Sequence, residues 1–491
     1  MAPRIQIKPI GSFSFLLALH VLFLVSYAML MPAFEGADEP EHLRYIETVY
    51  NGEKIHPIDR SDPRRYGIEV YQPPLYYHLS ALVARMFPVV FPDHLAVNPD
   101  KNPRFPFLAH DDPGEIFPFD PPRRTLRLFR ALSIIFGIAA FLLFAQILRL
   151  LMPESPQAAS IILLVAALWP NNLQILSVVS NDGLVYVLSL ALILTVLNCI
   201  QDDRPSHKQG LVVGTFFALG CLTKMTILLT ASALFVVIIL DSILDRHRGR
   251  AYLRILPAVL LPIFLLSGPF FVSQMIWYGS PTGEALLKIL TPAWIQPSPR
   301  SFSTIIHAML EILPGSFLAD LCWQQLTLPF VSLQLFVLWV FFNVLMGIRT
   351  AFLGFRRPPR EQILHQMLVF TSFFFMFFAV YRISAQWIGM QIRHVWNLWP
   401  ITLLAPYCAI REMKLLKGIN RKRILNIIFC GLMCVLVSIN CLVIYNFIIT
   451  YKPLERESRA DLNYSLLINY WVQSPGMGVQ YLQEAARSDS Q

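Results

Sequence analysis

Ionisable side chains stand at the ends of long apolar runs in this sequence of 491 residues. Asp38-Glu39-Pro40-Glu41-His42 follows the first run directly, and Lys224 lies in the short turn between two later runs. Carboxyl, ammonium and imidazole groups can carry acid–base chemistry or bind a charged substrate. The other polar segments at run ends are Asn171-Asn172, Asn181-Asp182, Trp277-Tyr278-Gly279-Ser280 and Gln391-Ile392-Arg393-His394. Whether these groups meet depends on the elements that carry them.

The composition indicates a protein that crosses a membrane many times. Hydrophobic residues make up 55% of the chain, charged residues only 14%, and the mean hydropathy is +0.53. Soluble domains carry about 25% charged residues. These values exclude a soluble enzyme, a disordered scaffold and a small disulfide-rich secreted domain. The cysteines form no CxxC pair and no metal-ligand spacing, so the sequence predicts neither a disulfide framework nor a zinc site.

Apolar runs of the length that crosses a bilayer predict the fold class. We expect an all-α polytopic membrane protein with about eleven transmembrane helices of roughly 20 residues each. The predicted spans lie near residues 12–34, 125–150, 157–178, 182–201, 209–223, 225–244, 253–276, 325–348, 364–383, 395–410 and 424–449. We divide the chain into a transmembrane domain over residues 1–450 and a C-terminal tail over residues 451–491.

The placement of basic residues predicts the orientation, because Lys and Arg gather in the cytoplasmic loops of membrane proteins. With the N-terminus inside, three later inner loops hold 14 basic residues and the short outer loops hold 5. The inner set is Arg246, Arg248, Arg250, Arg254, Arg349, Arg356, Arg357, Arg360, Arg411, Lys414, Lys417, Arg421, Lys422 and Arg423. The net charge of +9 therefore indicates orientation rather than nucleic-acid binding, and the C-terminal tail is predicted to lie outside.

The long outer loop over residues 35–124 is predicted to carry a helix on the membrane surface. A helix near residues 74–87 is bounded by prolines and is too short to span, since a crossing needs about 20 residues. Leu75, Leu79, Leu82 and Met86 recur at helical spacing, as expected for an interfacial helix. With this orientation the polar run ends collect outside, where they predict a shared outward-facing cavity.

Each polar residue also has a structural interpretation. Asp38 and Glu41 have the spacing of a capping box in front of a helix. Asn181-Asp182 can cap the next helix, and Lys224 can be an anchor that reaches the membrane surface. Trp277 and Tyr278 are typical of an aromatic belt. These alternatives remain open at the level of sequence.

For Arg393 the sequence favours a functional role, and for His42 it favours a structural one. Arg393 lies outside, against the positive-inside trend, which favours a functional role. His42 by itself is typical of a surface histidine, and a role as a metal ligand is the weaker alternative.

These residues resemble the GT-C superfamily of membrane glycosyltransferases and, more narrowly, a bacterial family of multi-spanning membrane proteins within it. The stretches that carry the resemblance are Asp38-Glu39-Pro40-Glu41-His42, Gln72-Pro73-Pro74-Leu75-Tyr76-Tyr77, Asn181-Asp182, Leu222-Thr223-Lys224, Tyr278-Gly279-Ser280-Pro281 and Gln391-Ile392-Arg393-His394. The sequence departs from the family pattern at Ile392 and His394, where Gly and an aromatic residue are usual, and at Ser316-Phe317-Leu318, where Ser-Phe-Trp is usual.

The resemblance implies transfer of a sugar from a polyprenyl-phosphate-linked donor to a cell-surface glycan, lipid or protein, outside a bacterial plasma membrane. It makes Asp38 the candidate general base, with Glu39 second. Arg393 and Lys224 become candidate ligands of the donor phosphate. Further cavity candidates are His42, Asn181, Asp182, Tyr278 and His394. The resemblance implies no nucleic-acid partner and identifies no cofactor. It does not decide whether the reaction requires a divalent metal ion.

Two functions of other classes compete with transfer. A transporter or flippase of lipid-linked sugars would need gates on both faces and usually has internal repeats, and the sequence has no internal repeat. A non-catalytic membrane scaffold would present the long outer loop to a partner. The sequence names neither the sugar, nor the acceptor, nor whether the lipid carrier is a monophosphate or a diphosphate, and it leaves the oligomeric state undetermined.

Overall fold

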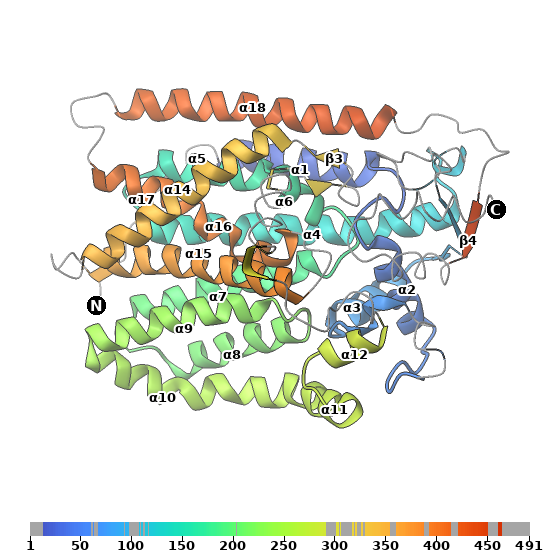
Figure 1. Ribbon diagram of the computed structural model, residues 1–491, viewed down its shortest axis with the longest axis horizontal. Coiled ribbons are helices and arrows are strands. Elements are labelled where there is room, and N and C mark those ends of the chain that lie inside the picture. The colour runs from blue at the N-terminus through green and yellow to red at the C-terminus, as the bar shows by residue number, and fades with distance from the viewer. Residues whose placement is uncertain are drawn as a thin grey trace.

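Long helices laid side by side make up most of the computed structural model, with shorter helices gathered at one end (Figure 1). The structure describes residues 13–59, 62, 67–92, 94–97, 108, 110, 113–115, 117–202, 204–290, 301–303, 305, 317–318, 320–321, 326–327, 329–353, 360–386, 392–413, 421–449 and 460–463.

The long helices follow the predicted apolar runs, and shorter helices lie between them. The first half holds α1 (Phe13–Leu30), α2 (Glu39–Tyr50), η1 (Ile68–Tyr71), α3 (Leu75–Ala84), η2 (Pro113–Glu115), α4 (Pro121–Leu151), α5 (Pro156–Leu168), α6 (Pro170–Ile175), α7 (Asp182–Gln201), α8 (His207–Cys221) and α9 (Ile227–Leu244). The second half holds α10 (Arg246–Pro262), η3 (Ile263–Ser267), α11 (Gly268–Tyr278), α12 (Glu284–Leu290), α14 (Pro329–Leu353), α15 (Arg360–Gln386), η5 (Ile392–Leu398), α16 (Trp399–Thr402), α17 (Leu404–Met413) and α18 (Arg421–Ile449). The described residues include four short strands, β1 (His94–Val97), β2 (Asp320–Leu321), β3 (Leu326–Thr327) and β4 (Ala460–Asn463). They form two antiparallel pairs, β1 with β4 and β2 with β3.

Eight helices or helix runs in the described part of the chain are long and apolar enough to cross a membrane. They are Phe13–Leu30, Pro121–Leu151, Asp182–Gln201, Ile227–Leu244, Arg246–Tyr278, Ser332–Phe352, Leu364–Arg382 and Arg423–Ile448. The prediction of a helical multi-spanning protein is thereby confirmed. The remaining three predicted spans are shorter or broken helices, so the number eleven stays a prediction.

One of these breaks has a local cause. The run near residues 157–178 divides into α5 and α6 at Trp169-Pro170, where Trp169 has an extended backbone. A residue before proline is driven out of the helical region by the proline ring. The break separates α5 from the short helix α6, which is followed by Asp182 at the start of α7.

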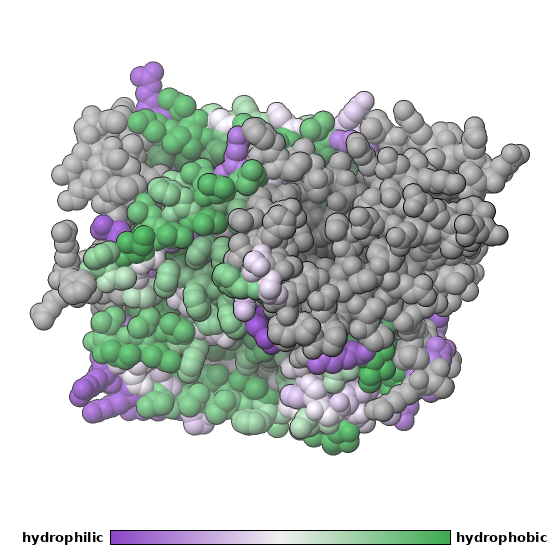
Figure 2. Space-filling view, viewed as in Figure 1, coloured by the Kyte–Doolittle hydropathy of each residue, from purple (hydrophilic) through white to green (hydrophobic). Residues whose placement is uncertain are grey.

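The helices pack closely where small residues permit it. A Cβ atom added to Gly214 of α8 would lie 2.0 Å from the carbonyl oxygen of Val259 in α10. Such contact between backbones is typical of small residues at four-residue spacing in membrane helices, and Gly210 stands one turn earlier on the same face. Hydrophobic side chains cover the outer surface of α9, α10 and α14 (Figure 2), among them Phe235, Leu261 and Phe341.

The two ends of the bundle differ in charge. Asp38 directly precedes α2, which lies at one end of the bundle, whereas Arg246, Arg248 and Arg250 stand in the first turns of α10 at the opposite end (Figure 1). Strand β1 of the first loop pairs with β4 of the C-terminal tail, so the loop and this part of the tail lie together. The side of the membrane that each end faces stays a prediction.

Helix α3 lies within residues 74–87, where the surface helix was predicted, and whether it lies on a membrane stays a prediction. Tyr76, Tyr77 and Ala81 are buried against the molecule, and Leu82 and Met86 are exposed. Its first backbone N–H, at Leu75, donates to the carbonyl oxygen of Leu222 at the end of α8 (2.9 Å). The helix therefore has one face on the protein and an apolar face outward, as expected for an interfacial helix.

A buried cluster of charged side chains fastens the proline-rich part of the first loop. The His110 ring lies 2.9 Å from Glu35 Oε1 and 2.7 Å from Glu115 Oε2. Burial alone would lower the pKa of His110, but hydrogen bonds and charge attraction from Glu115 and Glu35 raise it to about 9. The imidazolium thus ties the residues after α1 to those before α4.

Candidate functional site

The predicted site residues meet where several helix ends converge. Asp38 precedes α2, Asp182 begins α7, Lys224 lies between α8 and α9, and Arg393 lies in η5. Two ion pairs join these four side chains, Arg393 with Asp38 and Lys224 with Asp182. The four segments that carry Asp38, Asp182, Lys224 and Arg393 therefore lie close together.

Asp38 has a backbone conformation that non-glycine residues rarely adopt. Its φ is 60° and its ψ is 9°, in the left-handed region, and such strain is concentrated at functional sites. Its side chain makes no capping hydrogen bond to α2. Glu41 instead accepts a hydrogen bond from the backbone N–H of Ile68 (2.9 Å). The capping-box interpretation is wrong, because both carboxylates point to partners outside their own helix.

Arg393 is the partner of Asp38. Its Nη2 donates to Asp38 Oδ2, and its Nη1 donates to the carbonyl oxygen of Ala37 (3.2 Å). The side chains are 13% and 19% exposed, so the pair is reachable from solvent. Burial would raise the pKa of Asp38, but the positive charge and hydrogen bond of Arg393 hold it below its ordinary value. Asp38 is therefore ionised near neutral pH.

Lys224 and Asp182 form the second pair. Lys224 Nζ donates to Asp182 Oδ1 at 2.6 Å, and the side chains are 8% and 7% exposed. Ser180 Oγ donates to the other carboxylate oxygen (3.0 Å). Lys224 is thus held inside the protein by a carboxylate, so the interpretation as an anchor that reaches the membrane surface is wrong. Asn181 precedes α7 but does not cap it with its side chain; its amide donates to the carbonyl oxygen of Thr223 (3.3 Å).

Two more carboxyl groups stand near these pairs. Burial, followed by the negative charge of Asp38, raises the pKa of Glu69 to about 8. Burial likewise raises the pKa of Glu41 to about 7, with a further contribution from Asp38. A Glu69 carboxyl with this pKa is mostly protonated at pH 7. The site therefore combines ionised carboxylates beside the cations with a neutral carboxyl group.

The two histidines among the predicted residues are neutral. The ring of His42 hydrogen-bonds the Tyr77 hydroxyl (2.9 Å), and Tyr77 lies 3.5 Å from Glu69 Oε2. Burial lowers the pKa of His42 to about 3. Burial, followed by the positive charges of Arg393 and Lys224, lowers the pKa of His394 to about 3 as well. Neither ring adds a positive charge at neutral pH. His42 is 2% exposed, so it is no surface histidine.

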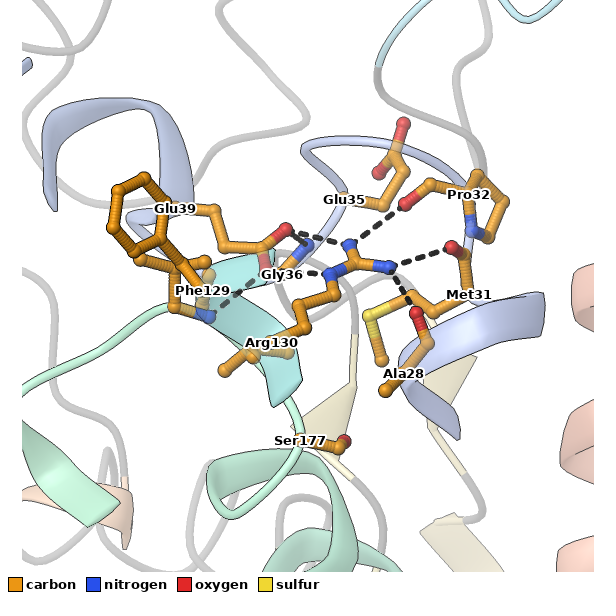
Figure 3. A network of polar contacts seen from close by, with 12 residues as sticks. Ala28, Met31, Pro32, Glu35, Gly36, Glu39, Phe129, Arg130 and Ser177 are labelled. Atoms are coloured by element: carbon orange, nitrogen blue, oxygen red, sulfur yellow. Dashed lines mark hydrogen bonds and ion pairs between the residues drawn. The ribbon is translucent and has the colours of Figure 1, made fainter. Parts of the chain in front are cut away.

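Glu39 occupies a different environment from Asp38, although the two are adjacent in sequence. Its oxygens accept hydrogen bonds from Arg130 Nε (2.8 Å) and Arg130 Nη2 (2.7 Å), as drawn in Figure 3. Both side chains are completely buried. The structure thus separates the two acidic candidates, with one at the solvent-reachable pair and one inside the protein.

The segment that carries Arg393 is fixed by its neighbours in η5. Trp396 Nε1 donates to Asn172 Oδ1 (3.2 Å), and the Asn397 amide donates to Thr230 Oγ1 (3.0 Å). Trp396 also stacks on Trp399, with ring centroids 4.8 Å apart. These contacts on two sides hold η5 against α6 and α9. The sequence prediction included the polar run end at Asn172 but gave it no such partner.

Tyr278 lies at the end of α11 and binds the first loop. Its hydroxyl accepts a hydrogen bond from the backbone N–H of Ile58 (2.9 Å) and lies 2.9 Å from the His56 ring. Gly279, which follows, has a φ of 72° and ends the helix as glycine commonly does. Among the described residues, no three or more His, Cys, Asp or Glu side chains are grouped to hold a metal ion.

The sequence prediction missed Glu69, Tyr77 and Arg130 as members of the polar network. Tyr77 stands in a stretch that carries the resemblance, and Glu69 lies three residues before that stretch, so position along the chain was the available signal. Arg130 lies within an apolar run, at 0% exposure. A charged residue inside a span is itself a signal of a buried partner.

One known protein family matches part of this chain in sequence. The family model for dolichyl-phosphate-mannose-protein mannosyltransferases matches residues 124–269, less than half of the chain. This stretch includes Asp182 and Lys224 and excludes Asp38 and Arg393. No curated protein sequence matches the chain significantly.

Three solved structures are similar in arrangement. The apo oligosaccharyltransferase of Archaeoglobus fulgidus has 13% identity and a TM-score of 0.48, covering 89% of this chain and 55% of its own. ArnT from Cupriavidus metallidurans bound to undecaprenyl phosphate has 11% identity and a TM-score of 0.49, covering 98% and 79%. Archaeal AglB from Archaeoglobus fulgidus, in complex with an inhibitory peptide and a dolichol-phosphate, has 13% identity and a TM-score of 0.49, covering 95% and 56%.

The chain spans about half the length of the oligosaccharyltransferase. Over residues 124–269 the chain carries the sequence pattern of a glycosyltransferase family, and the predicted resemblance to the GT-C superfamily is confirmed.

Proposed function

We propose that this protein transfers a sugar from a polyprenyl-phosphate-linked donor to an acceptor hydroxyl group on the extracytoplasmic face of a bacterial plasma membrane. The observation that carries the proposal is the Asp38–Arg393 pair, a carboxylate and a guanidinium at the same solvent-reachable point. The family match supports it, because the family's description names a dolichyl-phosphate-linked sugar. The predicted topology, about eleven spans with the N-terminus inside, supplies the extracytoplasmic side.

In the proposed reaction Asp38 is the general base. Its carboxylate accepts the proton of the acceptor hydroxyl, and the acceptor oxygen forms a bond to the anomeric carbon of the sugar. The bond between that carbon and the phosphate oxygen breaks, and its electron pair remains on the lipid phosphate. The low pKa that Arg393 gives Asp38 keeps the base ionised.

Arg393 and Lys224 stabilise the charge that develops on the departing phosphate. In the described part of the chain the Nε of Arg393 is buried and has no hydrogen-bond partner, so this donor is available to a ligand. A guanidinium can offer two parallel donors to a phosphate, whereas an ammonium acts as a point charge. We assign the first role to Arg393 and the second to Lys224.

A donor phosphate must compete with two carboxylates for the cations of the site. Asp38 and Asp182 neutralise Arg393 and Lys224 in the structure. Because the pKa of Glu69 is raised to about 8, that carboxyl brings no full negative charge to the donor at pH 7. His42, Asn181, Tyr278 and His394 are proposed to line the site without exchanging protons with substrate.

The direct test is transfer by the purified protein in liposomes. Radiolabelled polyprenyl-phosphate hexoses and pentoses are supplied together with a bacterial envelope fraction as the source of acceptors. Appearance of label in lipid, glycan or protein acceptors is the expected result. Movement of label across the bilayer without transfer would indicate a flippase, and absence of both would favour a scaffold.

A further inference from the structure

We propose that Glu39 and Arg130 form a positioning pair, which fixes the Asp38 turn and the Asp182 segment in one geometry and takes no part in proton transfer. The inference rests on the proposed function for the meaning of that geometry. The contacts that carry it are those of one fully buried ion pair (Figure 3).

Glu39 has no oxygen left with which to accept a proton. Oε1 accepts from Arg130 Nε (2.8 Å) and from the backbone N–H of Val179 (2.9 Å). Oε2 accepts from Arg130 Nη2 (2.7 Å) and from the backbone N–H of Gly36 (3.1 Å). A carboxylate offers about four lone-pair sites, so its capacity is used. Glu39 cannot act as a base without breaking these bonds, which leaves that role to Asp38.

Arg130 extends the network to the end of α1. Its Nη1 donates to the carbonyl oxygens of Ala28 (3.1 Å) and Met31 (2.8 Å), and its Nη2 donates to that of Pro32 (3.0 Å). The last carbonyl groups of a helix lack partners within the helix, and a cation there is favourable. One guanidinium therefore joins the end of α1, the start of α2 and helix α4.

The Glu39–Arg130 pair is connected to Asp38 and to Asp182 through short segments of the chain. Gly36 and Glu39 bracket Asp38, so their bond closes the turn in which Asp38 has its left-handed backbone. Val179 stands three residues before Asp182, so its bond fixes the entry to α7. A Cβ atom on Gly36 would lie 2.5 Å from the Glu39 side chain, which shows how tightly the turn closes over the pair.

A buried ion pair of this kind is better explained by specificity than by stability. Removing two charges from water costs several kcal/mol for each ion, and apolar replacements often stabilise a protein. The Glu39–Arg130 pair is instead suited to fix one arrangement. Misplacement of a reacting group by about 1 Å can lower a rate about 100-fold, so the arrangement matters to Asp38.

The test compares Glu39→Gln and Arg130→Lys with the control Arg127→Lys. Arg127 lies one turn earlier on α4 and donates to the carbonyl oxygens of Ala28 (2.5 Å) and Met31 (3.2 Å), but its guanidinium stands over the ring of Phe119 (5.0 Å). Arg130→Lys keeps the positive charge but removes the planar guanidinium, which donates to both oxygens of Glu39. Only the monodisperse fraction of each protein is assayed, which removes differences in folding.

Two readouts are measured on each variant. Carbodiimide labelling of Asp38, followed by mass spectrometry, reports the pH at which this carboxyl is protonated. That pH depends on the burial of Asp38 and on its distance from Arg393, His42 and His394. Transfer rates give kcat and the donor KM. We expect the labelling midpoint to move to higher pH in Glu39→Gln and Arg130→Lys, with kcat lower by about 10- to 100-fold and an unchanged donor KM.

The outcomes are separable. A labelling midpoint and a kcat equal to the wild type in both variants would overturn the positioning role, as would equal changes in Arg127→Lys. If the midpoint moves but the wild type itself transfers no sugar, the positioning pair stands and the proposed function fails. If the wild type transfers sugar and the midpoint does not move, the function stands and the positioning pair fails.

Discussion

The guanidinium of Arg393 donates to the carboxylate of Asp38 from 355 residues away in the sequence. The proposed base and the proposed phosphate ligand are thus bound to each other in the structure without substrate. When a phosphate takes up part of the guanidinium, Asp38 loses some of its stabilising charge and its pKa rises. Binding of the donor should therefore make Asp38 a stronger base at the point where a proton must be accepted.

Replacement of Arg393 tests the phosphate contact. Charge-assisted hydrogen bonds contribute about 1.5–3 kcal/mol each, so Arg393→Ala should lower kcat/KM for the donor by roughly tenfold or more. Arg393→Lys should retain part of the donor kcat/KM that Arg393→Ala loses, because it keeps the positive charge but not the planar pair of guanidinium donors. Initial rates over a series of donor concentrations measure the effect. Arg382→Ala removes an exposed arginine of α15 and should leave kcat/KM unchanged. Wild-type donor kinetics in Arg393→Ala would remove Arg393 from the site.

The Lys224–Asp182 pair is open to a double-mutant cycle. Removal of one partner leaves a buried charge uncompensated, at a cost of about 3–5 kcal/mol. Lys224→Met and Asp182→Asn should therefore each lower the melting temperature, and the double variant should lower it by less than their sum. Donor use should remain impaired in the double variant, since the cation is gone. Recovery of donor use together with stability would mean that the pair is structural only.

Glu69 gives a prediction about stability and pH. Its pKa is raised from 4.5 to about 8 in the folded protein, so between these values the folded state holds a proton that the unfolded state has lost. The contribution of Glu69 to the free energy of unfolding therefore falls as pH rises through this interval. Glu69→Gln should flatten that part of the curve, as measured by thermal unfolding in detergent from pH 4.5 to 8. A slope equal to that of the wild type would show that Glu69 is ionised in the folded protein.

Reporter fusions test the predicted sidedness. A reporter that is active only outside the cytoplasm should be active after residues 100, 290 and 470 and silent after residues 250, 355 and 417. The physical basis is the excess of basic residues in the predicted inner loops. The inverted pattern at positions 250 and 417 would place the Asp38 end of the bundle in the cytoplasm and rule out an extracytoplasmic site.

Hydropathy and charge placement were sufficient to predict the helical class, the approximate spans and the meeting of Asp38, Asp182, Lys224 and Arg393. Each of these predictions rested on a short stretch of sequence, either a run of apolar residues or a polar residue at the end of such a run. The contact of Glu39 with Arg130 was not accessible in this way, because Arg130 lies inside an apolar run and not at its end. Glu69 was missed because it stands in the four-residue helix η1, which is too short for a periodic pattern to indicate burial. The break at Trp169 was missed because one proline was outweighed by the apolar run around it.

The most direct test of the account is the rate of sugar transfer by Asp38→Asn at saturating donor. Asparagine keeps the size of the side chain and is among the few residues that tolerate a left-handed backbone, so the turn should fold. It cannot accept the acceptor's proton, and the account predicts a loss of roughly 10²- to 10⁴-fold. Asp120→Asn is the matched control, since Asp120 caps α4 by accepting from the backbone N–H of Arg123 (2.8 Å) and should remain near wild type. Transfer by Asp38→Asn at the wild-type rate would contradict the assignment of Asp38 as the base.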